Sequence, residues 1–141
     1  IIVGEVRGGE ALDMLQAMNT GHDGSISTGH ANSAEDMISR LQTMVLTGAS
    51  NLPLPAITQQ IASAVDIIIH LSRMRDKTRK TMSISEVVGI EDGKVILRPL
   101  FQFEEDKERS SLKKVEGSLK RTKFEMIHPE KFINSGIYDY L

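Results

Sequence analysis

The sequence begins with Ile1-Ile2-Val3-Gly4-Glu5-Val6-Arg7-Gly8. Its first three residues are an apolar run, which Gly4 and the carboxylate of Glu5 follow. Continuous hydrophobicity indicates a buried strand of a parallel sheet. A carboxylate after such a strand lies at the carboxyl edge of the sheet, where open α/β folds bind ligands. Glu5 could orient water there or hold Mg²⁺ through water, although a single glutamate after a strand also marks where a chain meets solvent.

Helices and strands are expected to alternate beyond this strand. Apolar side chains recur at helical spacing from Ala11 to Met18, from Met37 to Val45 and from Ile57 to Val65. Short runs at Ser25 to Thr28 and at Ile67 to Ile69 are typical of strands, the second of them buried. This order predicts an α/β fold with a parallel sheet.

A hairpin is expected to follow. Strand-like runs at 81–90 and 94–103 flank Glu91-Asp92-Gly93, and Asp-Gly between two such runs is a strong hairpin signal. Pro99 cannot donate a backbone hydrogen bond, which predicts an edge or a bulge in the second run. The fold class expected is therefore α/β with an antiparallel β-hairpin extension.

The rest of the chain carries weaker signals. Residues 104–123 are rich in charges of both signs, which is typical of a solvated linker or an exposed helix. Residues 124–141 hold enough apolar side chains for a small cap or tail. The domain division expected is thus 1–103, 104–123 and 124–141. Because chain ends usually lie at the surface, an apolar strand at residue 1 suggests a segment cut from a longer polypeptide.

Composition excludes several classes of protein. The 141 residues are 40% apolar and 26% charged, with a net charge of −2 and no cysteine. Disulfides and thiolate chemistry are excluded, and no strong net field favours nucleic acid or an anionic membrane. The longest apolar stretch, 65–71, is too short to span a bilayer, and no signal peptide is recognisable. The basic run at 73–80 has no interleaved aromatic residue, so direct nucleic-acid binding is not expected.

Two histidines, His22 and His30, flank the strand at 25–28. Histidine suits phosphate sensing because it can donate to an oxyanion and titrates near neutral pH. It also commonly caps a turn or a helix end. His22, Asp23 and His30 could alternatively ligate zinc in a metal-dependent hydrolase, although their spacing matches no standard zinc pattern.

Arg7 and Arg40 are the candidate phosphate-binding cations. Arginine binds phosphate in a bidentate manner and can stabilise charge during phosphoryl transfer. A surface ion pair is the alternative interpretation of either residue.

Several ordered stretches resemble the type II/type IV secretion system ATPases, the GspE/PilT-like superfamily, and within it the CpaF-like ATPases that assemble Flp/Tad pili. The resemblance covers about residues 1–103. The motifs that carry it are Ile2-Val3-Gly4-Glu5-Val6-Arg7, Asn19-Thr20-Gly21-His22-Asp23-Gly24-Ser25, His30-Ala31-Asn32-Ser33, Ser39-Arg40-Leu41, Gln60-Ile61-Ala62-Ser63-Ala64-Val65-Asp66 and Glu86-Val87-Val88-Gly89.

The resemblance implies the carboxy-terminal part of a RecA-like P-loop NTPase, starting at the Walker B strand. It implies that Glu5 polarises the attacking water and supports Mg²⁺ through water, and that Arg7 helps to organise the site. His22 and His30 match the two histidines of the His box, with His30 nearer the γ-phosphate of ATP. Arg40, on the following helix, is implied as a nucleotide-binding residue.

Two features depart from the family pattern. Gly29 stands where a bulky apolar residue is usual before the second histidine, which adds backbone freedom beside His30. The P-loop motif Gly-x-x-x-x-Gly-Lys-[Ser/Thr] occurs nowhere in the chain. Without that phosphate cradle, we expect these residues alone to be inactive as an ATPase.

The resemblance also implies partners and a location. These are a homohexameric ring, inner-membrane pilus or secretion platform proteins, and a peripheral position on the cytoplasmic face of the inner membrane. The alternative function is a non-enzymatic interaction module, in which the hairpin and the basic run dock onto such platform proteins.

Overall fold

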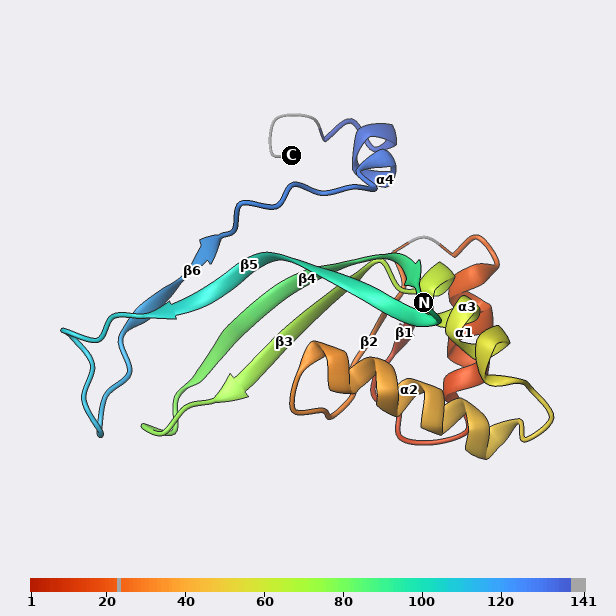
Figure 1. The fold of residues 1–141 in the computed structure, drawn as a ribbon, viewed down its shortest axis with the longest axis horizontal. Helices are drawn as coiled ribbons and strands as arrows, with labels where there is room; N and C mark the ends of the chain where they lie inside the picture. Colours follow the sequence, from red (N-terminus) through yellow and green to blue (C-terminus); the bar gives the residue numbers. More distant parts are fainter. Residues whose placement is uncertain (23, 138–141) are drawn as a thin grey trace. The chain divides into compact units, whose positions relative to one another are not determined.

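The computed structural model describes residues 1–22 and 24–137. They form two compact units, the first made of 1–66 with 89–97 and the second of 67–88 with the residues from 98 onward (Figure 1). Residues 138–141 of the expected cap lie outside the described residues. In the described part of the chain, no helix has the length and apolarity needed to cross a bilayer.

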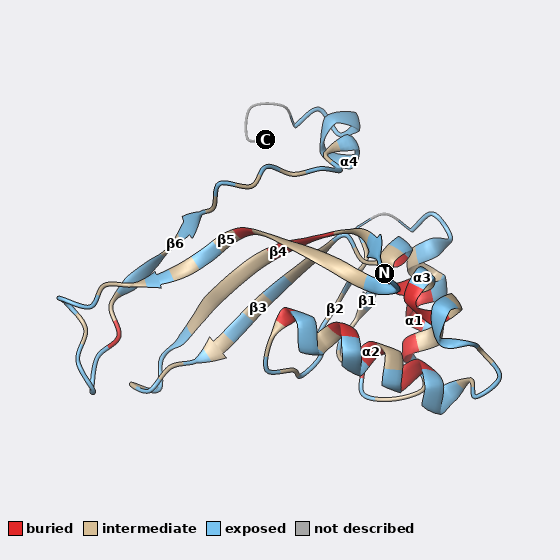
Figure 2. Cartoon of the chain, viewed as in Figure 1, coloured by how far each residue is buried: buried red, intermediate tan, exposed pale blue. Residues whose placement is uncertain are grey.

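Three helices build the core of the first unit. They are α1 (Ala11–Asn19), α2 (Ala34–Gly48) and α3 (Leu54–Ala64), and each contacts the other two. Buried positions recur along these helices (Figure 2), and the largest completely buried side chains are Leu15, Val45, Thr58, Ile57 and Ile61. The helical spacing in the sequence is therefore confirmed, because the apolar stripes pack against one another.

Local signals fix the beginnings of two of these helices. Ser33 is the N-cap of α2, and its hydroxyl accepts the N–H of Asp36 at 3.0 Å. This bond satisfies one of the backbone donors left open at a helix start. Helix α3 begins after Pro53, with a second proline in its first turn, where a missing N–H costs nothing.

The first unit also contains a two-stranded parallel sheet. Strand β1 (Ile2–Val3) pairs with β2 (Ile26–Ser27), so that Ile2 lies opposite Ile26. The parallel pairing is as predicted, but the predicted burial is wrong, because Ile2 is 81% exposed. Among the described residues each strand pairs only with the other, so neither strand has a neighbour along its outer edge.

A four-stranded antiparallel sheet provides most of the second unit, in the order β3-β4-β5-β6. Its strands are β3 (Ile67–Arg73), β4 (Arg79–Glu91), β5 (Lys94–Glu105) and β6 (Gly117–Arg121). The predicted hairpin is confirmed. Asp92 and Gly93 join β4 to β5 with φ values of 50° and 75°, the positive values that favour an Asp-Gly turn.

The expectation of a linker or exposed helix over 104–123 is wrong. This segment contains the end of β5, a loop and the whole of β6, which pairs with β5. Phe103 lies opposite Leu119, and Lys120 forms a 2.7 Å ion pair with Glu104. The mixed charges that indicated a linker instead pair across two strands. Pairing with β6 begins at Phe101, so Pro99 precedes the paired stretch.

Strand β3 is less buried than expected. It lies at the edge of the sheet. Ile69 is 54% exposed, and Leu71 is 61% exposed. Ile69 and Leu71 alternate with less exposed neighbours, so they lie on one face of the strand. The continuous apolar run in the sequence therefore did not correspond to a strand that is buried on both faces.

A buried carboxylate holds the last described segment against β4. Glu86 is 2% exposed, and its two oxygens accept the backbone N–H groups of Ile127 at 2.9 Å and His128 at 2.7 Å. The His128 ring nitrogen Nε2 lies 3.0 Å from the carbonyl oxygen of Val88. Helix α4 (Glu130–Asn134) follows directly. One of the motif glutamates thus has a structural role that the sequence did not reveal.

Candidate functional site

Glu5 and His30 come together at the carboxyl ends of the two parallel strands. Glu5 follows β1 by two residues and His30 follows β2 by three. Beyond the strand pair, the N–H of Val6 donates to the carbonyl oxygen of Thr28 at 2.8 Å. The Thr28 hydroxyl donates to the carbonyl oxygen of Gly4. These two hydrogen bonds extend the strand pairing into the loops and fix the backbone on which both side chains stand.

The Glu5 carboxylate lies between the Arg7 guanidinium and the His30 ring. Its Oε2 accepts a 2.6 Å hydrogen bond from the Arg7 guanidinium, and its Oε1 lies 3.0 Å from Nε2 of His30. The hydrogen bond from Arg7 lowers the pKa of Glu5 below its usual value. Burial opposes this with the next-largest effect, and the charges of Arg7 and then His30 lower the pKa further. Glu5 is therefore an ionised base near neutral pH.

One oxygen of Glu5 accepts no hydrogen bond from the described residues. The Glu5 side chain is 25% exposed, whereas those of Arg7 and His30 are largely exposed. Oε1 is itself buried and accepts no hydrogen bond among the described residues, because His30, although near, does not reach hydrogen-bond geometry. A buried carboxylate oxygen without a donor costs free energy unless water or a cation satisfies it. This atom fits a water molecule or the hydration shell of a divalent cation.

A turn built by Glu10 carries Arg7 next to Glu5. Glu10 Oε1 accepts the backbone N–H groups of Arg7 at 2.7 Å and Gly8 at 3.1 Å. Both hydrogen bonds lower the pKa of Glu10, and the one from the N–H of Arg7 has the larger effect. The sequence analysis missed this residue, and helix capping could not have revealed it, because the Glu10 side chain makes no cap hydrogen bond to α1.

Two glycines bring this turn against the end of α2. A Cβ atom added at Gly48 would lie 2.7 Å from both Cα and the carbonyl oxygen of Gly9. Only residues without a side chain allow two backbones to approach so closely. The turn that carries Arg7 is therefore anchored to the helix that carries Arg40.

Gly29 has a different role from the one that the sequence suggested. It is not among the glycines with positive φ, so backbone freedom is not what the position requires. A Cβ atom there would lie 2.9 Å from Cε of Met37 and 3.5 Å from Val6. Met37 occupies the space beside residue 29, and the backbone leading to His30 is packed on that side.

Arg40 lines an open hollow with His30. The hollow has a volume of about 300 Å³, and its other lining residues are Ala31, Asn32 and Asp36. Asp36 lies one helical turn before Arg40 and adds a carboxylate to the side chains of His30 and Arg40 that line the hollow. The hollow therefore offers both a donor set for an oxyanion and a carboxylate.

The structure places His22 apart from this group. Its Nδ1 lies 3.1 Å from the carbonyl oxygen of Ala17 and 3.2 Å from the hydroxyl of Thr20, at the end of α1. This is the helix-end capping that the sequence left open as an alternative. Asp23 lies outside the described residues. Within the described ranges, no group of three or more acidic, histidine or cysteine side chains could hold a metal ion.

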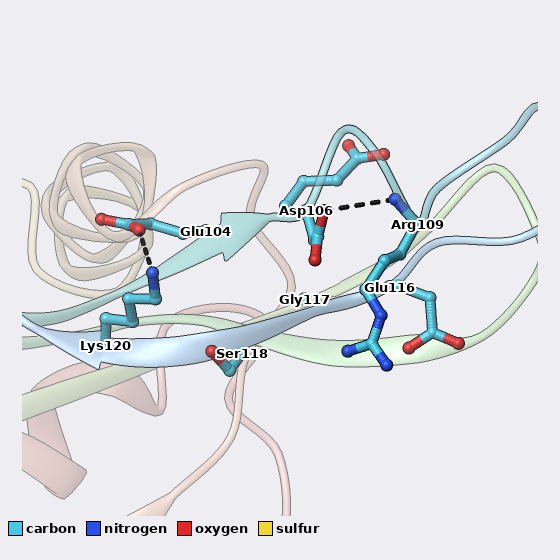
Figure 3. Close-up of a pocket in the computed structure, with 8 residues that line it drawn as sticks. Glu104, Asp106, Arg109, Glu116, Gly117, Ser118 and Lys120 are labelled. Atoms are coloured by element: carbon cyan, nitrogen blue, oxygen red, sulfur yellow. Dashed lines mark hydrogen bonds and ion pairs between the residues drawn. The ribbon is translucent and has the colours of Figure 1, made fainter.

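A second hollow in the other unit is occupied by its own charges (Figure 3). Glu104 and Lys120 form an ion pair across it, and the Asp106 carboxylate accepts the backbone N–H of Arg109 at 3.2 Å. Its other two carboxylates, Glu105 and Glu116, pair with Arg75 and Lys114, so each acidic group that lines the hollow already has a partner. The hollow beside Glu5 is therefore the better candidate for a binding site.

Comparisons with known proteins agree with this geometry. Residues 1–123 match the family model described as Type II/IV secretion system protein. TrbB, a conjugal transfer protein of Rhizobium radiobacter, is 35% identical over 106 residues, which are 75% of this chain and 31% of TrbB. The type IV secretion system protein PtlH of Bordetella pertussis is 40% identical over 75 residues, covering 52% of this chain and 22% of PtlH.

A solved structure shows the same fold. The crystal structure of the VirB11 ATPase from the Brucella suis type IV secretion system, in complex with sulphate, superposes with a TM-score of 0.58 at 34% identity. The match covers 61% of this chain and 27% of VirB11. The mixed α/β fold with an antiparallel sheet is thus shared. The chain spans between about a fifth and a third of the length of the curated relatives it matches.

Proposed function

Because this chain belongs to the type II/IV secretion system protein family, we propose that it is the part of a motor ATPase that positions the attacking water and couples ATP hydrolysis to secretion or pilus assembly. The observation that carries the proposal is the Glu5 carboxylate, ionised and flanked by Arg7 and His30, with one buried oxygen that accepts no hydrogen bond from the described residues. The fold expected around it is a RecA-like P-loop core.

In this mechanism Glu5 orients and polarises the water that attacks the γ-phosphate. Its oxygen Oε1, which lies 3.0 Å from Nε2 of His30, would accept a hydrogen bond from that water or from the hydration shell of Mg²⁺. Mg²⁺, when bound, neutralises charge on the β- and γ-phosphates. Phosphoryl transfer asks little covalent chemistry of a protein, so positioning and charge account for the catalysis.

Arg7 and His30 beside Glu5 would serve different purposes. Arg7 holds the carboxylate ionised and oriented through the 2.6 Å contact. His30 is largely exposed and lines the hollow together with Arg40, so both can donate to a phosphate oxygen. His22, at the end of α1, would act on the nucleotide only through that helix end.

The nucleotide site also needs a phosphate cradle from outside these residues. The P-loop motif is absent from the 141 residues, and backbone N–H groups of such a loop supply most phosphate contacts. We therefore propose that these residues alone do not hydrolyse ATP. In the working motor, the site would lie in a homohexameric ring of the Flp/Tad type, bound to platform proteins at the cytoplasmic face of the inner membrane.

The test is ATP turnover by this chain and by a fusion that places the amino-terminal part of VirB11 from Brucella suis before it. We expect no turnover from the chain alone, turnover from the fusion, and loss of turnover in the fusion with Glu5→Gln. Glu35→Gln, the same chemical change on the exposed first turn of α2, is the control and should leave turnover unchanged. Turnover by the chain alone would contradict the proposal.

A non-enzymatic interaction module is the second candidate. The exposed apolar side chains of β3 favour it, because an edge strand with exposed isoleucine and leucine is a typical place for another protein to bind. Binding of platform proteins by this chain, unaffected by Glu5→Gln, is the result that distinguishes this function from catalysis.

A further inference from the structure

One end of the second unit carries a protruding leucine among basic side chains. The feature consists of the β3–β4 turn (residues 73–80) and the β5–β6 loop (residues 105–116), named here the basic face. Neither segment contributes to the site around Glu5. Its properties therefore give a further inference that does not depend on the proposed ATPase chemistry.

Specific hydrogen bonds hold the two segments together. Asp76 accepts the backbone N–H of Val115 at 2.7 Å, and Arg75 donates to the carbonyl oxygen of Ser111 at 3.0 Å. Arg75 also forms a two-bond ion pair with Glu105. The hydroxyl of Thr78, followed by the N–H of Val115, lowers the pKa of Asp76 to about 2. These contacts join the two segments, so the basic face is one surface rather than two independent loops.

Leu112 stands at the tip of this surface. Ser111 and Lys114 form a β-bridge around it, with the N–H of Ser111 donating to the carbonyl oxygen of Lys114 at 2.7 Å. Leu112 is thus a central residue of a two-residue turn, and it is 87% exposed. Such turns favour glycine, asparagine, aspartate, serine or proline, so local turn chemistry does not explain a leucine.

Positive charge is concentrated around Leu112. The basic face holds nine lysine and arginine side chains against five acidic ones, whereas the whole chain has a net charge of −2. Two of the acidic groups are paired, Glu105 with Arg75 and Glu116 with Lys114. Asp76 and Asp106 accept backbone N–H groups of their own loops. Glu108, the fifth acidic residue, is exposed, as are eight of the nine basic ones, so the surplus of positive charge faces solvent.

We propose that the basic face binds an anionic phospholipid bilayer, with Leu112 inserted between the headgroups. An apolar tip followed directly by two lysines, Lys113 and Lys114, suits a bilayer, because each lysine can extend its charged end to the phosphates while its aliphatic stem lies along the apolar boundary. A protein partner would instead favour an apolar cluster with a dry rim. The neighbours of Leu112 in its turn are Ser110, Ser111, Lys113 and Lys114, which supply no such cluster.

The experiment uses vesicles of phosphatidylglycerol and phosphatidylethanolamine, with phosphatidylcholine vesicles as the neutral comparison. The chain contains no tryptophan, so Leu112→Trp introduces a single fluorescent reporter. We expect its emission to shift to the blue on anionic vesicles and to be quenched by brominated lipid. Leu54→Trp, an equal change at an exposed position of α3 in the other unit, should show neither effect.

Cosedimentation measures the energetic contributions without the reporter. Leu112→Ser should lower the partition coefficient about tenfold, and Lys113→Ala about fivefold. Lys94→Ala, on the exposed start of β5, should change it little. Higher salt should weaken the binding of wild type.

Equal binding to anionic and neutral vesicles, or no blue shift at position 112, would overturn the proposal. If vesicles do not bind but an acidic protein partner does, the basic face is a protein interface. ATP turnover by the fusion bears on the proposed ATPase alone, so the two proposals fail separately.

Discussion

The two hydrogen bonds that Glu86 accepts from the segment after β6 give the sharpest structural prediction. Both Glu86 oxygens accept backbone N–H groups, from Ile127 and His128, at a position that is 2% exposed. Glu86→Gln keeps the size of the side chain but leaves one oxygen acceptor. The new amide NH₂ then faces one of the two backbone N–H groups, so one charge-assisted bond is lost.

The expected magnitude follows from that loss. A hydrogen bond to a charged group contributes about 1.5–3 kcal/mol. We expect the free energy of local opening of this segment to fall by about 2 kcal/mol, which is about thirtyfold in the opening equilibrium. Opening of one segment can occur without global unfolding, so the effect should be confined to residues near 127 and 128.

Amide hydrogen exchange measures this directly. In Glu86→Gln the Ile127 and His128 amides should exchange about thirtyfold faster than in wild type. Glu91→Gln, the same change at an exposed position of β4, is the control and should leave both rates unchanged. Unchanged rates at 127 and 128 in Glu86→Gln would show that the carboxylate does not hold this segment.

Three further predictions test other contacts. Gly48→Ala should destabilise the protein by about 2–3 kcal/mol in urea unfolding, because its Cβ would clash with the Gly9 backbone; no loss of stability would refute the close approach. Gly29→Ala should cost only about 1 kcal/mol, because the clashing atom is the flexible end of Met37, and adding Met37→Ala should relieve this clash; a cost as large as that of Gly48→Ala would contradict that reasoning. Asp76 has its pKa lowered to about 2 from 3.8 by the hydroxyl and N–H groups that donate to it, so its stabilising effect should be complete above about pH 4 and be lost as the pH falls toward 2. Asp76→Asn should therefore lower the melting temperature near neutral pH and flatten the acid side of the melting-temperature profile, and an unchanged profile would contradict this.

Periodic signals predicted the elements of the fold well. The apolar stripes of α1, α2 and α3 and the Asp-Gly hairpin are where the sequence indicated, because helical periodicity and turn chemistry are local properties. Burial was predicted less well, since whether Ile2 or Ile69 is covered depends on which strands lie beside it. The charge-dense segment was misread because Lys120 and Glu104 neutralise each other only after β6 pairs with β5.

The candidate site was predicted only in part, because local motifs reveal some of its residues while other contacts join residues far apart in the sequence. Glu5, Arg7 and His30 were named from strand ends and motifs, and the structure brings these three together. Glu10 and the Gly9–Gly48 contact were missed. A backbone approach between residues 39 positions apart leaves no local periodicity to detect.

The most direct test of the central claim separates nucleotide binding from hydrolysis at Glu5. In the fusion with the VirB11 amino-terminal part, Glu5→Gln should retain bound ATP while its turnover falls about a hundredfold or more, as expected when a water-positioning group is lost. Glu35→Gln should match wild type in both measurements. Undiminished turnover in Glu5→Gln, with Mg²⁺ and ATP at saturation, would contradict the assignment of Glu5 as the group that activates water.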